Sequence, residues 1–431
     1  MLLEVALPVP VPHTFTYRTS DSIGPGTRVQ VRFGGRRLTG WVVGPTPEQR
    51  EPKNLRDIES VLESQPSVPA DVLELCRWIA DYYLAPIGLV LRTALPVVLS
   101  DGVRLEQPLK KRKVVRIIRE LPSLQERDEL FGRAVRQRAL YELLETLGSA
   151  QDLSQLISHQ GFSSALVRAL EERGLVAVTE QAVERDPFAA MPSPDPPALI
   201  PTPAQQAALA ELAGAVARPD SSAPATAPFL LHGVTGSGKT LVYIELLRAV
   251  LNRGLGAIVL VPEIALTPQT VARFRSHFGD RIAVLHSALS DGERYDAWHA
   301  LHEGEKRIAI GARSAIFAPI ARLGAIVVDE EHESTYKQNE APRYHARELA
   351  VVRARLARAV CVLGSATPSL ESWHNAQRGK FRALTLPERV EGRPLPPVRI
   401  VDLRTGKAEA DRGAQGVETR LSCSLSEPLV T

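Results

Sequence analysis

The chain has 431 residues, of which 44% are hydrophobic and 23% charged, and its formal net charge is +3. This length predicts more than one domain, and the composition excludes a disordered polyelectrolyte. No run of about 18 apolar residues is present, so we expect no spanning helix and no membrane partner. The three cysteines, Cys76, Cys361 and Cys423, are far apart and form no CxxC pair for zinc. We therefore expect a cytoplasmic protein in a reducing compartment.

Residues 1–98 are predicted to form a small β-rich domain that ends in a helix. Short strand-like runs such as RVQVRF and LTGWVVG alternate with glycine and proline turns, which is typical of a small barrel or a sandwich. Residues 69–85 have helical periodicity before Pro86. The predicted apolar face of this helix consists of Val72, Leu75, Cys76, Ile79, Tyr82 and Tyr83.

Residues 104–183 are predicted to be helical with a short β ending, in the order of a winged-helix domain. Two or three amphipathic helices, within 133–148 and 153–174, precede a glycine and the strand-like run LVAV. Seven Lys or Arg residues lie between Arg104 and Arg119, against Glu106 alone. Such a run is either a phosphate-contacting strip or a solvated face, and the sequence leaves both readings open.

Residues 186–201 contain six prolines and are predicted to be a linker, after which the pattern changes. Residues 202–385 alternate apolar strands with helices, as in PFLLHGV, GAIVLVP, AIVVDEE and AVCVLGS. Strands of this kind are buried on both faces of a parallel sheet. The fold class is therefore multidomain α/β, with one P-loop lobe of the RecA-like type.

The first candidate site follows the strand at 229–231 and precedes a helical segment. Its sequence, GVTGSGKT, matches the P-loop pattern G-x-x-x-x-G-K-[ST] in the strand–loop–helix context that the pattern requires. Backbone N–H groups at the helix N-terminus favour phosphate, the lysine reaches the β- and γ-phosphates, and the threonine binds Mg²⁺. We expect ATP binding by Gly233, Val234, Thr235, Gly236, Ser237, Gly238, Lys239 and Thr240.

Further polar residues follow other strands of the predicted sheet. Asp329 and Glu330 end the run AIVV, and beside a P-loop Asp329 would bind Mg²⁺ while Glu330 orients and deprotonates the attacking water. Lys239, Asp329 and Glu330 are thus the catalytic candidates. Gln205 precedes the P-loop strand and is a candidate to bind the adenine edge. The run GSATPS at 364–369 is either a nucleotide-sensing segment or a simple turn.

These segments resemble superfamily 2 helicases, and in particular the primosomal helicase family PriA. The resemblance extends from the N-terminus to VDLR and rests most specifically on DEEHESTYKQ followed by PRYHAR. The segments that carry it are VALPVPVPHTFTY (5–17), RVQVRFGGR (28–36), GVTGSGKT (233–240), VPEIALTPQT (261–270), VLHSALSDGER (284–294), GARSAIFAP (311–319), VVDEEHESTYKQ (327–338), PRYHAR (342–347), GSATPSLES (364–372) and VDLR (401–404).

The resemblance implies DNA contacts in two places. The family's first domain holds the 3′ end of a DNA strand, here through Phe15, Thr16, Tyr17 and Gly34, with Arg56 nearby. Thr16 stands where relatives often have an acidic residue, and its hydroxyl can still bond a base edge or a sugar. An aromatic-rich loop and a neighbouring arginine imply single-stranded DNA contacts by Arg313, Tyr336, Arg343 and Tyr344, together with His345. Ala312 replaces a common threonine beside Arg313.

The resemblance also implies a function in replication restart. Such a protein binds stalled or branched forks, uses ATP and Mg²⁺ for 3′-to-5′ unwinding, and has other primosome proteins and single-strand-binding protein as partners. Residues 386–431 would begin a second helicase lobe, whose remainder and zinc-binding cysteines the sequence does not contain. An alternative is therefore a fork-binding adaptor that binds ATP without unwinding. A small-molecule kinase is disfavoured by GSATPS following DEEH.

Overall fold

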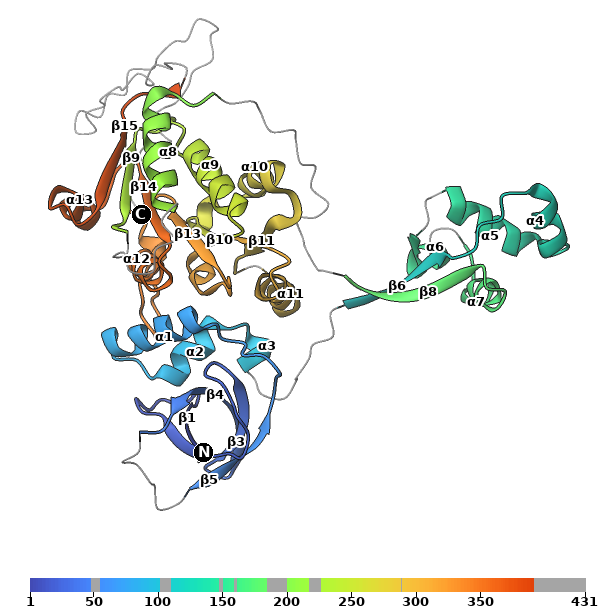
Figure 1. Ribbon diagram of the computed structural model, residues 1–431, viewed down its shortest axis with the longest axis horizontal. Coiled ribbons are helices and arrows are strands. Elements are labelled where there is room, and N and C mark those ends of the chain that lie inside the picture. Colours follow the sequence, from blue (N-terminus) through green and yellow to red (C-terminus); the bar gives the residue numbers. More distant parts are fainter. Residues whose placement is uncertain are drawn as a thin grey trace, which may run out of the picture. The chain divides into compact units, whose positions relative to one another are not determined.

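A computed structural model of the chain describes residues 1–47, 55–100, 110–146, 150–158, 161–183, 200–216, 226–287 and 289–390 (Figure 1). Most of the predicted linker at 186–201, the start of the basic run at 104–109 and the segment VDLR lie outside these residues. Nearly all of the predicted beginning of a second lobe, residues 386–431, also lies outside them. No helix in the described part of the chain is both long and apolar enough to cross a bilayer.

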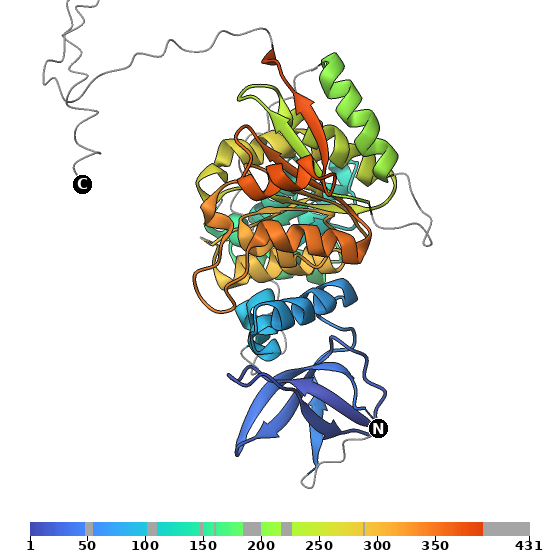
Figure 2. The same cartoon turned by 90° about the vertical axis from the view of Figure 1, so that its left-hand side faces the viewer.

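The N-terminal strands form a closed barrel, which resolves the predicted choice between a barrel and a sandwich (Figure 2). Alternating side chains of the third and fourth strands fill the barrel, and Val29, Val31 and Val42 are fully buried. The barrel closes through a short parallel pairing of two strands, in which Tyr17 and Arg18 lie opposite Arg56 and Asp57. The strands, in the spatial order β1-β2-β5-β3-β4, are β1 (Leu2–Ala6), β2 (Phe15–Arg18), β5 (Arg56–Val61), β3 (Arg28–Phe33) and β4 (Arg36–Pro45).

Three helices follow the barrel: α1 (Ala70–Tyr82), α2 (Ile87–Ala94) and α3 (Val97–Ser100). The apolar face predicted for α1 is buried from Val72 to Ile79. Tyr82 differs from the prediction because it is 63% exposed. It ends the helix at the margin of the apolar face and stacks on Trp78, with ring centroids 4.6 Å apart.

The segment from 110 to 183 confirms the predicted helices and closing strand but begins differently from the prediction. The basic run does not continue as a helix, because residues from Lys110 onward form β6, which pairs antiparallel with β8 along its whole length. This long-range pairing, together with burial of Val114 and Val115, outweighs the local preference of a lysine-rich run. The winged-helix assignment stays a prediction. The elements are β6 (Lys110–Ile117), α4 (Leu124–Phe131), α5 (Val135–Thr146), β7 (Ala150–Asp152), α6 (Leu153–Ser158), α7 (Ser164–Glu172) and β8 (Val176–Val183).

The lobe beyond residue 200 contains the expected parallel sheet. Seven strands, all parallel, lie in the order β11-β12-β10-β13-β14-β9-β15. They are β9 (Phe229–Gly233), β10 (Gly256–Leu260), β11 (Ile282–Leu285), β12 (Ile308–Gly311), β13 (Leu323–Val328), β14 (Val360–Ser365) and β15 (Arg382–Leu386). The helices are α8 (Pro203–Val216), α9 (Lys239–Asn252), α10 (Pro268–Phe278), α11 (Asp291–His302), α12 (Ala346–Ala357) and α13 (Leu370–Gln377).

Helices cover both faces of this sheet, so its strands alternate between two cores. Phe229 and Leu231 point into one core, with α8, α9 and α10. Leu230 of the same strand points into the other core, with α11 and α12. Because β13, β14 and β9 are neighbours and parallel, their carboxyl ends meet at one edge of the sheet, where ligands bind in open α/β folds.

Helix α12 also contacts the helices that follow the barrel. Arg353 of α12 is fully buried and pairs with Asp71 of α1 at 2.8 Å. Its guanidinium also donates to the carbonyl oxygen of Ile316 and, at 2.8 Å, to that of Ala318. Each of its three nitrogens therefore donates to at least one acceptor, which lowers the cost of burying a guanidinium.

We predict that Arg353→Ala destabilises the protein by about 3 kcal/mol, because it leaves a partly buried carboxylate and two carbonyls without their cation. Urea unfolding followed by circular dichroism measures the effect. Arg355→Ala is the matched control, since Arg355 lies on the same helix and is exposed; its cost should stay within about 0.5 kcal/mol. Equal destabilisation by the two substitutions would contradict the structural role of the buried pair.

Candidate nucleotide site

The P-loop connects the end of β9 to the first turn of α9. Gly236 and Gly238 have φ values of 82° and 79°, a region that side-chain-bearing residues rarely adopt. These conformations turn the chain sharply, so that α9 begins at Lys239 with its N-terminus facing the loop. Free N–H groups at such a terminus, reinforced by the helix dipole, form an anion site.

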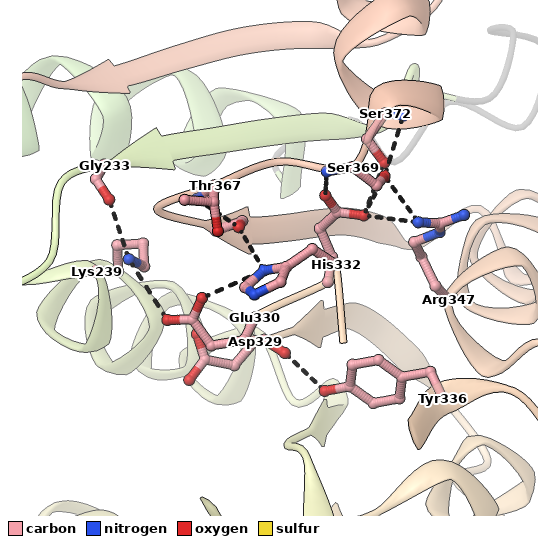
Figure 3. A network of polar contacts seen from close by, with 12 residues as sticks. Gly233, Lys239, Asp329, Glu330, His332, Tyr336, Arg347, Thr367, Ser369 and Ser372 are labelled. Atoms are coloured by element: carbon pink, nitrogen blue, oxygen red, sulfur yellow. Dashed lines mark hydrogen bonds and ion pairs between the residues drawn. The ribbon is translucent and has the colours of Figure 1, made fainter. Parts of the chain in front are cut away.

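Lys239 links this loop to the acidic motif (Figure 3). Its side chain is buried, and Nζ donates to the carbonyl oxygen of Gly233 at 3.0 Å. The same nitrogen lies 3.7 Å from Oε1 of Glu330. The two motifs, 90 residues apart in the sequence, therefore meet, because the strands that precede them end at the same edge of the sheet.

Asp329 follows β13 and is held by two tyrosines. The Tyr243 hydroxyl donates to Oδ1 of Asp329 at 2.9 Å, and the Tyr336 hydroxyl donates to its carbonyl oxygen at 2.6 Å. Burial and the neighbouring Glu330 raise the pKa of Asp329, while the bond from Tyr243 and the charge of Lys239 oppose this rise. A bound cation would lower the pKa of Asp329, as the charge of Lys239 does.

Glu330 adopts an uncommon backbone conformation, with φ at 42°. Such conformations in residues other than glycine concentrate at functional sites. Its Oε2 lies 3.6 Å from Nδ1 of His332, which in turn shares a hydrogen bond of 2.8 Å with Oγ of Ser365. The Ser365 hydroxyl also accepts from the N–H of Thr367 at 3.0 Å. The acidic motif is thus connected directly to the run GSATPS after β14.

Glu331 is the residue that the sequence analysis missed. It is fully buried, and its carboxylate accepts from Arg347 at 3.1 Å, from the N–H and hydroxyl of Ser369 at 2.7 and 3.0 Å, and from the hydroxyl of Ser372 at 2.8 Å (Figure 3). A third acid after a strand carries no local sign of burial. The sequence signal that could have indicated this burial is the segment SLES at 369–372, because Ser369 and Ser372 supply donors to the carboxylate.

Gln205 lies against the P-loop. It is 1% exposed; its Nε2 donates to the carbonyl oxygen of Ser237 at 2.8 Å, and its Oε1 accepts from the N–H of Thr202 at 2.8 Å. One end of the amide therefore braces the P-loop, and the other end holds the residue that precedes α8. A contact with adenine stays a prediction.

The candidate DNA contacts in the barrel fall into two groups. Tyr17 is 3% exposed and its hydroxyl donates to the carbonyl oxygen of Arg32, so its ring is part of the barrel core. The Thr16 hydroxyl donates to Glu4 at 2.8 Å. Phe15 is only partly buried and packs edge-on against Phe33. Gly34 lies in the exposed turn between β3 and β4.

The candidate DNA contacts in the aromatic-rich loop divide in the same way. Tyr336 and Tyr344 are each 1% exposed, which leaves no ring face open to a base. Tyr336 instead supports Asp329, and Tyr344 packs edge-on against Phe317. Arg343 is exposed, whereas Arg313 is partly exposed and its Nη1 donates to the carbonyl oxygens of Thr335 and Lys337 at 3.5 Å.

Comparisons with known proteins agree with this architecture. The family model described as "3'DNA-binding domain (3'BD)" matches residues 4–96, and the model "DEAD/DEAH box helicase" matches residues 202–376. The replication restart protein PriA of Bacillus subtilis (strain 168) is 34% identical over 94% of this chain and 57% of its own length. The PriA protein of Haemophilus influenzae is 36% identical over 94% of this chain and 54% of its own length.

Similarity to solved structures is weaker. RecG bound to a three-way DNA junction matches with 24% identity and a TM-score of 0.35, over 46% of this chain and 25% of that one. A likeness at this score carries no argument about the site. The assignment therefore depends on the sequence comparisons and on the geometry of the P-loop and the acidic motif.

Together, the barrel matched as a 3′ DNA-binding domain and the lobe with its P-loop and acidic motif define the class: proteins with a DEAD/DEAH box helicase domain. Within this class, the chain belongs to the PriA family of replication restart proteins. It spans a little more than half the length of the Bacillus and Haemophilus relatives.

We predict that Glu331→Gln destabilises the lobe by about 3 kcal/mol, because the amide removes the negative charge that Arg347 and three other donors face. Hydrogen exchange should also become faster in residues 365–372, which the carboxylate holds. Glu340→Gln, at an exposed position in the same lobe, is the control. Unchanged exchange and stability in Glu331→Gln would show that the network contributes nothing.

Proposed function

We propose that the chain acts in replication restart, binding branched DNA with its N-terminal barrel and binding and hydrolysing ATP in its P-loop lobe to drive 3′-to-5′ unwinding. The observation that carries this proposal is the meeting of a complete P-loop with Asp329 and Glu330 at one edge of one sheet. The match of residues 4–96 to a 3′ DNA-binding domain supports the DNA arm.

The residues present fit an ATP–Mg²⁺ complex. Thr240 and Asp329 line one cavity of about 130 Å³, and hydroxyl and carboxylate oxygens are the ligands that Mg²⁺ takes in nucleotide sites. When bound, Mg²⁺ would neutralise charge on the phosphate oxygens. Lys239 would exchange its bond to the Gly233 carbonyl for the β- and γ-phosphates, while the loop N–H groups hold the phosphate chain.

Glu330 is placed to act on water. Its carboxylate is partly exposed and lies between Lys239 and His332. When Lys239 turns to phosphate, Glu330 is left as the nearest base for orienting and deprotonating an attacking water. A change in the position of this carboxylate would then reach the segment after β14 through the contacts of His332 and Ser365.

The DNA arm of the proposal relies on exposed groups. Phe15 and the Gly34 turn would form the strand-end pocket on the barrel, and Arg313 and Arg343 would bind phosphates of a single strand. Fork DNA, other primosome proteins and single-strand-binding protein are the partners we propose, in the cytoplasm. No membrane partner is proposed.

Lys239→Ala should weaken ATP binding in the presence of Mg²⁺ by about tenfold or more, because a charge-assisted contact to phosphate is lost. Isothermal titration calorimetry measures this, with Lys380→Ala, an exposed lysine of the same lobe, as control. Identical affinities for wild type and Lys239→Ala would remove the nucleotide assignment.

The same pair of variants tests the helicase function itself. Wild type and Lys380→Ala should separate a forked duplex in the presence of ATP, and Lys239→Ala should not. ATP binding without strand separation in wild type would favour the alternative, an ATP-binding adaptor at forks.

We also predict that the protein binds a forked duplex with a free 3′-hydroxyl more tightly than the same fork with a 3′-phosphate. Fluorescence anisotropy without ATP measures both. Affinity should fall about tenfold or more between about 50 and 200 mM salt, since neutralised phosphates release counterions. Equal affinity for the two ends would eliminate the strand-end pocket, and salt-independent binding would eliminate the phosphate contacts.

A further inference from the structure

Tyr243 is a polar exception on the buried face of α9. The neighbouring buried residues of the helix, Val242, Leu246 and Leu247, carry only hydrocarbon side chains. Tyr243 is 1% exposed, yet its hydroxyl is satisfied by Oδ1 of Asp329 at 2.9 Å. A phenol at this depth contributes a directed hydrogen bond in addition to apolar area.

The backbone of β14 leaves room for this hydroxyl only because residue 364 is glycine. A Cβ atom at Gly364 would lie 1.7 Å from the Tyr243 hydroxyl oxygen and 2.9 Å from the ring carbon that bears it. Contacts this short do not occur between real atoms, so any larger residue would displace the phenol. Gly364 also accepts, through its carbonyl oxygen, from the N–H of Glu331 at 3.0 Å.

Tyr243 and the proposed Mg²⁺ ligands border the same space. Thr240 and Tyr243 are three residues apart on α9 and so lie on one side of the helix. Both line the cavity of about 130 Å³ into which Asp329 also faces. Tyr336 holds only the backbone carbonyl of Asp329, so it does not set the direction of the carboxylate.

We propose that Tyr243 is a positioning residue that orients the Asp329 carboxylate toward the Mg²⁺ of a bound nucleotide, with Gly364 providing the space for its hydroxyl. This inference depends on the proposed function, since it assumes a metal–nucleotide complex in the P-loop. Removing a group that hydrogen-bonds to a metal ligand commonly changes metal affinity by about 10–100-fold. The hydrogen bond from Tyr243 to Oδ1 is of this kind.

The test is the affinity of Mn²⁺ for the protein–ADP complex, followed by electron paramagnetic resonance of the free ion. Tyr243→Phe should weaken this affinity by about tenfold, while the affinity for ADP without metal stays unchanged. Tyr141→Phe is the matched control: it removes another buried hydroxyl, which donates to the carbonyl oxygen of Arg119 at 2.8 Å in a different part of the chain. It should leave Mn²⁺ affinity unchanged.

A second variant tests the role of Gly364. Gly364→Ala should weaken Mn²⁺ binding as much as Tyr243→Phe does, because it displaces the hydroxyl. Adding Tyr243→Phe to Gly364→Ala should then cause no further loss of metal affinity, since the two changes act on one interaction. Additive losses would overturn the proposed link between these residues.

The outcomes separate this inference from the proposed function. If wild type binds no ADP with or without metal, the nucleotide site itself fails. If wild type binds ADP and Tyr243→Phe retains full Mn²⁺ affinity, the positioning role fails and the nucleotide site stands. If Tyr243→Phe also loses metal-free ADP binding, Tyr243 is a structural residue, which likewise overturns the inference.

Discussion

Burial of seven parallel strands on both faces is the constraint on which the site depends. The side chains of β9, β13 and β14 are committed to two apolar cores, so the strands have little freedom to shift or change order. Because the strands are parallel neighbours, the residues that follow them emerge at one edge. The packing of the two cores therefore brings the P-loop lysine and the acidic motif together. The contact between lysine and acid is a result of this packing, and the lobe does not depend on it.

The acidic motif divides its residues between chemistry and architecture. Asp329 and Glu330 face the P-loop, whereas Glu331 turns inward and collects four donors from α12 and from the segment after β14. Four donors satisfy the hydrogen-bonding capacity of this buried carboxylate, and they fix the orientation of the loop that carries its neighbours. Residues 329–331 thereby connect the end of β13 to α12 and α13 beside the nucleotide site.

Helix α12 connects this site to the N-terminal part of the chain. Arg347 near its start binds Glu331, and Arg353 two turns later binds Asp71 of α1. Tyr83, at the end of α1, donates to Glu348 and accepts from the N–H of His345 at the N-cap of α12. The two helices α12 and α1 are thus joined by one buried guanidinium pair and by the two hydrogen bonds of Tyr83.

The sequence by itself determined the elements whose chemistry is local: the P-loop, the Asp329–Glu330 pair, and strands apolar enough to form a parallel sheet. Tertiary structure decided what depends on burial by distant segments. Pairing with β8 made a strand of the basic run, the barrel and lobe cores enclosed Tyr17, Tyr336 and Tyr344, and Glu331 became an internal anchor. A residue's chemical type is written in the sequence, but whether its side chain faces solvent, a core or a partner depends on which remote elements pack against it.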